Sequence, residues 1–220
     1  MGKFIAIDGL DGSGKGTQTD ILVERLKKEN KKVRVLSFPM YENDSSLFAR
    51  MYLDGKFGKN PSDTNAYAAS MFFASDRYIS YRTDWIKDIL DPDTYVIANR
   101  YTSANAVHQL SKLPYEEWEG FLNWLWDFEF SKLGLPAPDL VLYLELPPAL
   151  SLSLVKSRSD TTGQKMDIHE KDTAYMDKCY EAALYSCKKL GWSQIKCYNG
   201  NEIRTREDIA EEIYKEACKL

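Results

Sequence analysis

The chain has 220 residues, a length typical of one domain or of one domain with an inserted lid. Its 44% hydrophobic residues are enough to build a core, which excludes disorder as the main state. The 29 basic and 33 acidic residues give a net charge of −4, whereas proteins that coat a nucleic-acid polymer are usually basic. A small anionic ligand would therefore need basic residues at particular positions.

Membrane and secreted classes are also disfavoured by the sequence. No apolar run approaches the roughly 20 residues of a membrane span, and the first residues lack the basic-then-apolar layout of a signal peptide. We therefore expect a cytoplasmic protein without a membrane partner. The four cysteines form no C-x-x-C pair and the chain has two histidines, so we expect neither a zinc site nor a disulfide framework.

Strand-like and helix-like segments alternate along the chain. Residues 3–8 are apolar and partly β-branched, end in a glycine-rich turn and precede a helical pattern at 17–28. Further strands are expected at 33–38, 95–98, 140–146 and 195–198, and further helices at 64–90, 103–110, 115–133, 149–158, 167–190 and 206–219. This alternation predicts an α/β fold with a mainly parallel sheet covered on both faces, whose ligands bind beyond the carboxyl ends of the strands.

Two segments leave alternatives open. Residues 159–165 are polar and lie between two helical patterns, so they form either a plain surface loop, which composition favours, or a mobile lid. Aromatic residues crowd the helical pattern at 115–133. They either fill the core, which is the commoner outcome, or form a subunit interface.

The turn after the first strand carries a phosphate-binding pattern. Residues 9–15, GLDGSGK, fit G-x-x-x-x-G-K between a predicted strand and a predicted helix. Glycines let backbone N–H groups surround a phosphate, the helix N-terminus adds partial positive charge, and Lys15 adds a full one. The residues expected to bind the phosphates of ATP are Gly9, Gly12, Ser13, Gly14, Lys15, Gly16 and Thr17. An ordinary glycine-rich turn is the alternative.

Two positions depart from the common form of this loop. Gly16 follows the lysine where Ser or Thr normally contacts magnesium, and Thr17 comes one residue later, so we expect contact with the ion through water. The strand at 95–98 is followed by Asn99 rather than by the carboxylate that often ends such a strand. The sequence GSGKGTQ is similar to the loop of adenylate-kinase-like nucleoside monophosphate kinases.

Six segments in order together resemble the thymidylate kinase family, in particular its bacterial type without arginine in the phosphate loop. They are GLDGSGKGTQ, FPMY at 38–41, FFASDR at 72–77, NRYTSANAVH at 99–108, LGLPAPDLVLYLEL at 133–146 and KMDIHE at 165–170. The resemblance implies a P-loop NTPase fold of the nucleoside monophosphate kinase kind, with a five-stranded parallel sheet flanked by helices. It also implies one domain over residues 1–220 with a lid at about 158–168, a homodimer, and phosphorylation of dTMP to dTDP with ATP and Mg²⁺.

The same resemblance assigns roles on the dTMP side. Phe73 would stack on the thymine ring, Arg77 would bind a base carbonyl, and Asn105 would contact the N3 edge. Arg100 would bind the acceptor phosphate, and Asp11 would hold the sugar 3′-hydroxyl. The other residues expected to line the nucleotide site are Phe38, Tyr41 and His108. Without the resemblance, Phe73 would be expected in the core and Arg77 on a solvated helix face.

The resemblance also assigns the groups that act on the phosphates. Besides Lys15, Arg100 and Asp11, these are Arg158 and Lys165 in the lid. Glu170 would face the sugar and the metal, so the candidate ligands of Mg²⁺, through water, are Asp11 and Glu170. An isolated DIHE would instead begin a helix, where acidic residues are favoured.

Three departures from the family pattern keep other functions open. Asn99 stands where the family has aspartate, Lys165 where arginine is usual, and His108 where an aromatic residue crowds the sugar 2′ position. The leading hypothesis is a dTMP kinase. The alternatives are a kinase for another deoxynucleotide or a deoxynucleoside, and a nucleotide-binding regulator without turnover.

Overall fold

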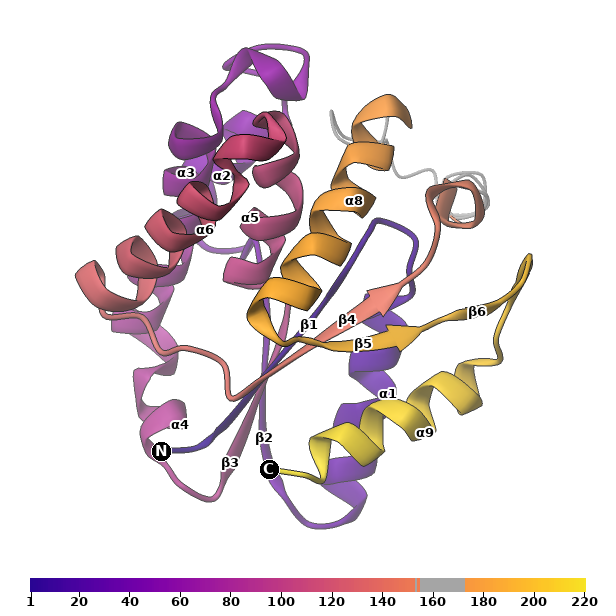
Figure 1. Ribbon diagram of the computed structural model, residues 1–220. Coiled ribbons are helices and arrows are strands. Elements are labelled where there is room, and N and C mark those ends of the chain that lie inside the picture. Colours follow the sequence, from indigo (N-terminus) through magenta and orange to yellow (C-terminus); the bar gives the residue numbers. More distant parts are fainter. Residues whose placement is uncertain (153, 155–172) are drawn as a thin grey trace.

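The computed structural model describes residues 1–152, 154 and 173–220 (Figure 1). One sheet of parallel strands has the order β2-β3-β1-β4-β5. The strands are β1 Lys3–Gly9, β2 Lys32–Ser37, β3 Thr94–Asn99, β4 Leu140–Glu145 and β5 Ser193–Lys196. The predicted α/β fold and its parallel sheet are confirmed. A small antiparallel pair, β6 Tyr198–Asn199 and β7 Glu202–Ile203, was not predicted.

Most of the predicted helices are present, with two interruptions. The helices are α1 Lys15–Lys28, α2 Leu47–Leu53, α3 Ala66–Ser80, α4 Ile86–Leu90, α5 Thr102–His108, α6 Trp118–Trp126, α8 Thr173–Leu190 and α9 Arg206–Ala217. A π-helical segment, Tyr81–Trp85, separates α3 from α4, and a second, Asp127–Lys132, follows α6. A further helix begins at 148. Among the described residues, no helix is both long enough and apolar enough to cross a membrane.

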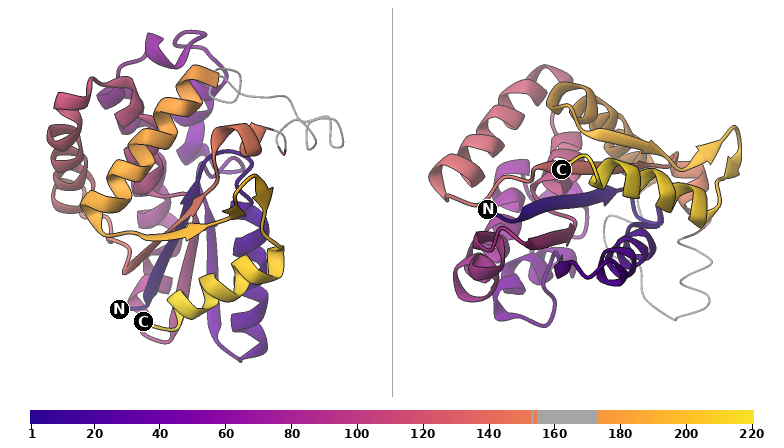
Figure 2. Two further views of the ribbon diagram at one scale, coloured as in Figure 1. Left: turned by 45° about the vertical axis from the view of Figure 1, so that its right-hand side comes forward. Right: turned by 90° about the horizontal axis from the view of Figure 1, so that it is seen from below.

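Alternating side chains of β1 face two different cores. Ile5 and Ile7 pack with the apolar residues of α1 and α9, while Phe4 and Ala6 pack with Trp85 on the opposite face. All of these side chains are buried, which explains why β1 reads as a continuous apolar run. Figures 1 and 2 show α1 and α9 side by side over one face of the sheet. Both chain ends lie at the edge where β1 begins, away from its carboxyl end (Figure 1).

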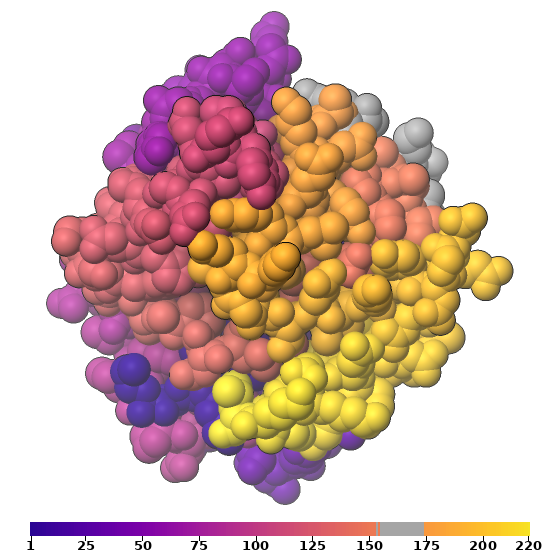
Figure 3. Space-filling view, in the orientation of Figure 1, coloured from indigo at the N-terminus to yellow at the C-terminus, as the bar shows by residue number. Residues whose placement is uncertain are grey.

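A third core joins α5, α6 and α8. Trp118 and Phe121 of α6 are buried in it, so the prediction that the aromatic residues of 115–133 fill the core is confirmed for these two. Trp124 is partly buried against the same core and stacks on Phe128 at 5.2 Å between ring centroids. In Figure 3, side chains of α6, α8 and α9 form a continuous surface over this side of the sheet. Because helices cover both faces of the sheet, a ligand can reach the strands only at their ends.

Candidate active site

A cleft of about 1430 Å³ lies at the carboxyl ends of β1 and β3. Its walls are the loop 11–14 with the start of α1, the end of β3, parts of α3 and α5, and the segment 203–209. Typical small-molecule sites have volumes of roughly 300–1,000 Å³. The cleft therefore has room for two nucleotide-sized ligands, and its position is the one predicted for a parallel sheet.

The phosphate-loop residues take the predicted strand, loop and helix positions. Gly9 ends β1, and a Cβ there would lie 2.7 Å from the Leu144 carbonyl oxygen, so the position excludes side chains. Gly12 and Gly14 have φ values of +83° and +86°, the left-handed region that favours glycine. Within the described chain no side chain caps the start of α1. The loop and the first turn of α1 therefore present backbone N–H groups at the cleft, as an anion site requires.

Lys15 is buried at the centre of this loop. Its Nζ donates hydrogen bonds to the carbonyl oxygens of Gly9 at 2.9 Å and Leu10 at 2.8 Å, and lies 3.8 Å from Asp11 Oδ1. Ser13 is also buried, and its Oγ has no hydrogen-bond partner in the part of the chain that the structure describes. The loop therefore concentrates positive charge and polar atoms at one end of the cleft.

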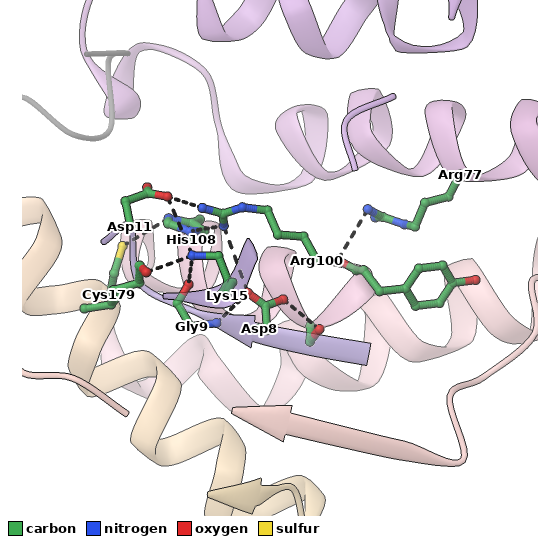
Figure 4. A network of polar contacts seen from close by, with 11 residues as sticks. Asp8, Gly9, Asp11, Lys15, Arg77, Arg100, His108 and Cys179 are labelled. Carbon is green, nitrogen blue, oxygen red and sulfur yellow. Dashed lines mark hydrogen bonds and ion pairs between the residues drawn. The ribbon is translucent and has the colours of Figure 1, made fainter. Parts of the chain in front are cut away.

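Arg100 follows β3 and carries its side chain to the phosphate loop. Its φ of +66° is unusual for a residue with a side chain, and its backbone N–H donates to the Ile7 carbonyl oxygen at 2.9 Å. Its guanidinium contacts the Asp11 carboxylate and His108 Nε2, the latter at 3.1 Å (Figure 4). Such strained backbone occurs often at functional sites. The structure thus brings together Arg100, Asp11, Lys15 and His108.

The contact with Arg100 fixes the tautomer of His108. A guanidinium only donates hydrogen bonds, so Nε2 accepts and the ring proton lies on Nδ1. Nδ1 is 3.6 Å from Cys179 Sγ, and burial raises the pKa of that thiol to about 12. Cys179 is therefore a neutral thiol packed behind the site.

A buried carboxylate next to the loop was missed by the sequence analysis. Asp8, at the end of β1, accepts hydrogen bonds from the Gly9 N–H at 2.9 Å and the Ser103 hydroxyl at 2.8 Å. The neighbouring strand ends at Asn99, whose Oδ1 is buried and has no partner among the described residues. Asp8 ends an apolar strand directly before a glycine-rich turn, and this position was the signal in the sequence that could have identified it.

Arg77 lines the other end of the cleft and has a partner that was not predicted. The guanidinium is buried and forms a two-pronged ion pair with Glu129, with Nε–Oε2 at 2.7 Å and Nη2–Oε1 at 2.5 Å. Nη1 donates to the Tyr101 carbonyl oxygen at 3.4 Å. Arg77 is therefore held rigidly at the cleft wall, although it comes from a helix surface that a sequence alone would place in solvent.

Two amide side chains, four residues apart on α5 and at its end, line the cleft. Asn105 is buried, and its Nδ2 donates to Ser70 O and to Glu129 Oε1, both at 3.3 Å. Gln109, four residues further, is 1% exposed and lines the cleft, and neither of its amide atoms has a partner in the described residues. Buried polar groups are normally paired, so Gln109 is an additional candidate for ligand contact that the sequence analysis missed.

The aromatic candidates differ in where they lie. Phe73 lines the cleft and packs edge-on against Tyr52, with ring centroids 5.8 Å apart. Tyr41 lines the cleft and is largely exposed, whereas Phe38 is buried against Tyr101 and reaches the cleft from the core. Phe73 and Tyr41 therefore have surface to offer a flat ring, and Phe38 mainly supports the wall.

The lid candidates cannot be placed in this way. Arg158, Lys165 and Glu170, with the expected lid at 158–168, lie outside the described residues. Their roles remain predictions from the sequence resemblance.

Comparison with known proteins gives one consistent family. The sequence profile of the family "Thymidylate kinase" matches residues 7–197. The thymidylate kinase of Plasmodium falciparum is 31% identical over 219 residues, which cover 100% of this chain and 91% of that protein. The thymidylate kinase of Mycobacterium tuberculosis strain H37Rv is 30% identical, with 86% and 87% of the two chains covered.

A solved structure supports the same fold. The thymidylate kinase of Candida albicans superimposes with a TM-score of 0.69 at 22% identity, covering 99% of this chain and 92% of that one. The five-stranded parallel sheet flanked by helices is therefore that of P-loop nucleoside monophosphate kinases.

Proposed function

The chain belongs to the thymidylate kinase family, and on that premise we propose that its cleft transfers the γ-phosphoryl group of ATP to dTMP, giving dTDP and ADP. One observation carries the proposal most directly. A single cleft joins a phosphate loop to a buried group of hydrogen-bonding side chains, Arg77 and Asn105, that suits an uncharged base. Phosphoryl transfer needs both substrates positioned in one site from which water is excluded.

The acceptor dTMP is proposed to lie with its base at the Arg77 end. Phe73 offers a ring face for stacking, and Arg77 retains N–H groups for a base carbonyl. The phosphate of dTMP would then reach Arg100, which exchanges Asp11 for the ligand. Asp11, released from Arg100, is placed to accept a hydrogen bond from the sugar 3′-hydroxyl. Tyr41 and His108 line the space between base and phosphate.

ATP is proposed to occupy the other half of the cleft. Its phosphates lie on the loop, where Lys15 exchanges the carbonyl oxygens of Gly9 and Leu10 for phosphate oxygens. Its base points toward the start of α9, because Thr205 and Ile209 line the cleft beyond the loop. Lys15 and Arg100 then face the charge that develops on the transferred group. Arg158 and Lys165 are proposed to add charge from the lid.

The residues at the loop fit a magnesium ion. Mg²⁺ prefers oxygen ligands and keeps several waters. Asp11 offers a carboxylate, and the unpartnered oxygens of Ser13 and Asn99 lie beside the loop. We propose that these oxygens and Thr17 hold the ion, in part through water, with Glu170 as a further ligand. When bound, the ion neutralises charge on the phosphate oxygens.

An exposed apolar face supports the proposed homodimer. Four large side chains of α3, at a spacing that brings most of them to one side of the helix, are exposed: Tyr67, Met71, Tyr78 and Ile79. Contiguous apolar surface of this kind is typical of subunit interfaces. Light scattering should give twice the 25.3 kDa chain mass, and Met71→Glu should shift the protein toward the monomer.

A coupled assay of ADP release tests the proposed reaction. The purified protein is supplied with ATP, Mg²⁺ and, in turn, dTMP, dUMP, dCMP, dGMP and thymidine. We expect the highest kcat/KM with dTMP. Faster turnover of another nucleotide or of thymidine would support the alternative kinase, and ATP binding without any turnover would support the regulator.

A further inference from the structure

Glu129 links three separate segments behind the cleft. It lies in the π-helical segment after α6, is fully buried, and its carboxylate accepts the Arg77 ion pair described above. The same carboxylate accepts hydrogen bonds from Thr102 Oγ1 at 2.7 Å and from Asn105 Nδ2 at 3.3 Å. Glu129 therefore holds both polar side chains that are proposed to contact the base.

The contacts of Asn105 leave its amide one orientation. Its Nδ2 donates to the Ser70 carbonyl oxygen and to Glu129 Oε1, and both of these atoms are acceptors. Turning the amide over would place Oδ1 against two acceptors, which repel it. Oδ1 has no hydrogen bond within the described chain, and Asn105 lines the cleft. Toward a ligand, Asn105 therefore offers an acceptor and no donor.

Arg77 offers the complementary pattern. A guanidinium has five N–H donors and no acceptor. Glu129 takes two of them and the Tyr101 carbonyl oxygen takes a third, so two remain for a ligand. The base end of the cleft thus presents donors from Arg77 beside the acceptor of Asn105.

This pattern distinguishes two classes of pyrimidine. Thymine and uracil carry a carbonyl oxygen at C4, which accepts, next to N3–H, which donates. Cytosine has the reverse arrangement, because its 4-amino group donates and its N3 accepts. Cytosine would bring donor against donor at Arg77 and acceptor against acceptor at Asn105. Unpaired buried groups of this kind reject a ligand strongly.

We propose that Glu129 is the positioning residue that makes this site select imide bases over cytosine, by fixing the amide of Asn105 and the guanidinium of Arg77. The inference rests on the proposed function, since it requires the base of the acceptor to lie at this end of the cleft. Glu129 itself touches no substrate. It acts through the hydrogen bonds that it accepts.

The substitution Glu129→Gln tests the proposal. A glutamine amide has both an acceptor oxygen and an NH₂ donor. Either end of the Asn105 amide could therefore pair with it, and the residue at 129 would no longer select one orientation of Asn105. We expect the ratio of kcat/KM for dTMP to that for dCMP to fall at least about tenfold, chiefly through KM for dTMP, with KM for ATP within about twofold of wild type. A loss of fold stability alone would lower activity with both substrates equally.

A matched control is available at Glu145. This glutamate is also buried and accepts hydrogen bonds from Tyr180 at 2.7 Å and Tyr198 at 2.9 Å, but it does not line the cleft. Glu145→Gln should leave the dTMP to dCMP ratio unchanged. An equal fall of the ratio in Glu145→Gln and Glu129→Gln would overturn the proposal, because a general loss of packing would then explain both.

A second variant covers the case in which Glu129→Gln does not fold. Glu129→Asp keeps the negative charge opposite Arg77 but withdraws the carboxylate from Asn105, so the ratio should fall here too. If a Glu129 variant folds and keeps the wild-type ratio of kcat/KM for dTMP to that for dCMP, the positioning role of Glu129 is overturned while the proposed function stands. A wild-type protein that does not phosphorylate dTMP overturns the proposed function instead, and the two failures are distinguishable.

Discussion

The two ends of the cleft hold their charged groups in different ways. At the phosphate end, Arg100 pairs with Asp11, and the two side chains are 20% and 14% exposed. At the base end, Arg77 pairs with Glu129, and the corresponding values are 2% and 0%. Lys15 at the phosphate end is held by carbonyl oxygens that a phosphate can replace.

The difference follows from the ligands that the two ends receive. A phosphate group brings its own charge, so cations can leave a local partner for it at little cost. A pyrimidine base is uncharged and is distinguished by the order of its donors and acceptors. Protein groups that contact it must therefore be fixed before it arrives, and buried side chains that hydrogen bonds to the protein hold in one orientation achieve this. The cations at the phosphate end can therefore exchange their protein partners for the ligand, whereas the side chains at the base end are already held in place before the ligand binds.

The sharpest test of this comparison replaces each arginine by alanine. Arg77→Ala leaves the Glu129 carboxylate buried without a cation, and we expect the free energy of unfolding to fall by about 3–5 kcal/mol. Arg100→Ala breaks a partly exposed pair and should cost under about 1 kcal/mol, while reducing phosphoryl transfer severely. Urea unfolding of both variants measures the difference. Equal losses would mean that the two ends do not differ in the way described.

The next largest effect is expected from Lys15→Ala. Removing its ammonium group should lower kcat more than 100-fold, about 3 kcal/mol of transition-state stabilisation, because the charge faces the transferred phosphoryl group. Stability should change less than activity, since the hydrogen bonds of Lys15 to carbonyl oxygens lie at the loop and the nearby Asp11 keeps its ion pair with Arg100. Lys32→Ala is the control, because Lys32 pairs with Asp91 far from the cleft. Retention of more than a tenth of wild-type turnover would contradict the assignment of Lys15.

The same contrast explains which parts of the site could be predicted. The phosphate loop is contiguous, and its glycines, its lysine and its place between strand and helix are local features, so Lys15 was identified from spacing. Glu129 is 52 positions from Arg77 in the sequence, within an aromatic helical pattern that indicates core. Nothing in the local sequence shows that its carboxylate meets Arg77. Preorganised contacts between distant segments are therefore the part that required a structure.

The secondary structure shows a similar limit. The segment 64–90 was predicted as one helix, but the π-helical segment Tyr81–Trp85 divides it into α3 and α4. The π-helical segment is only five residues long, so the apolar residues on either side of it still read as one helical pattern. The seven-residue α2 was missed because two turns are too short for a clear periodicity. The five strands of the sheet were all identified, most securely the apolar runs of β1, β3 and β4, whereas the more polar β5 begins two residues before its predicted range.

Lys112 is a further, partly buried cation, and it lies behind the base end of the cleft. Burial lowers the pKa of Lys112 to about 7, and its described hydrogen-bond partners, Tyr52 OH at 2.9 Å and Thr64 O at 3.0 Å, are uncharged. The unfolded chain binds this proton up to about pH 10.5. Between pH 7 and 10.5 the unfolded state therefore holds more protons, and stability rises with pH.

We therefore expect Lys112→Met to remove part of this pH dependence. Between pH 7 and pH 8.5, wild type should gain about 1 kcal/mol of unfolding free energy relative to Lys112→Met. Cysteine thiols of the unfolded chain begin to ionise in this range, but both proteins carry the same cysteines, so this contribution cancels in the comparison. Urea unfolding at the two pH values provides the measurement. Parallel changes in the two proteins would show that Lys112 keeps its charge, and that the base end accommodates it.

The smallest predicted effect concerns Asn99, at the boundary between the two ends. Its Oδ1 is buried beside the loop without a partner among the described residues, and it precedes Arg100 directly. If Asn99 contributes an oxygen to the metal but no charge, Asn99→Asp should lower the Mg²⁺ concentration for half-maximal rate by about threefold, since Mg²⁺ favours carboxylate ligands. Asn123→Asp, the same change on the exposed surface of α6, should leave that concentration unchanged.

The competing explanation is that Asn99 only ends β3 and orients Arg100. Asp8, on the neighbouring strand, already places a buried carboxylate near this point, 4.0 Å from Arg100 Nη1. A second carboxylate at 99 would then meet repulsion that a bound ion does not relieve, and the variant would lose stability with no gain in magnesium affinity. Magnesium titrations of initial rate, with urea unfolding of the same proteins, separate these outcomes. Superimposable rate curves together with a lower unfolding free energy for Asn99→Asp would exclude position 99 from metal binding and would assign it to the support of Arg100.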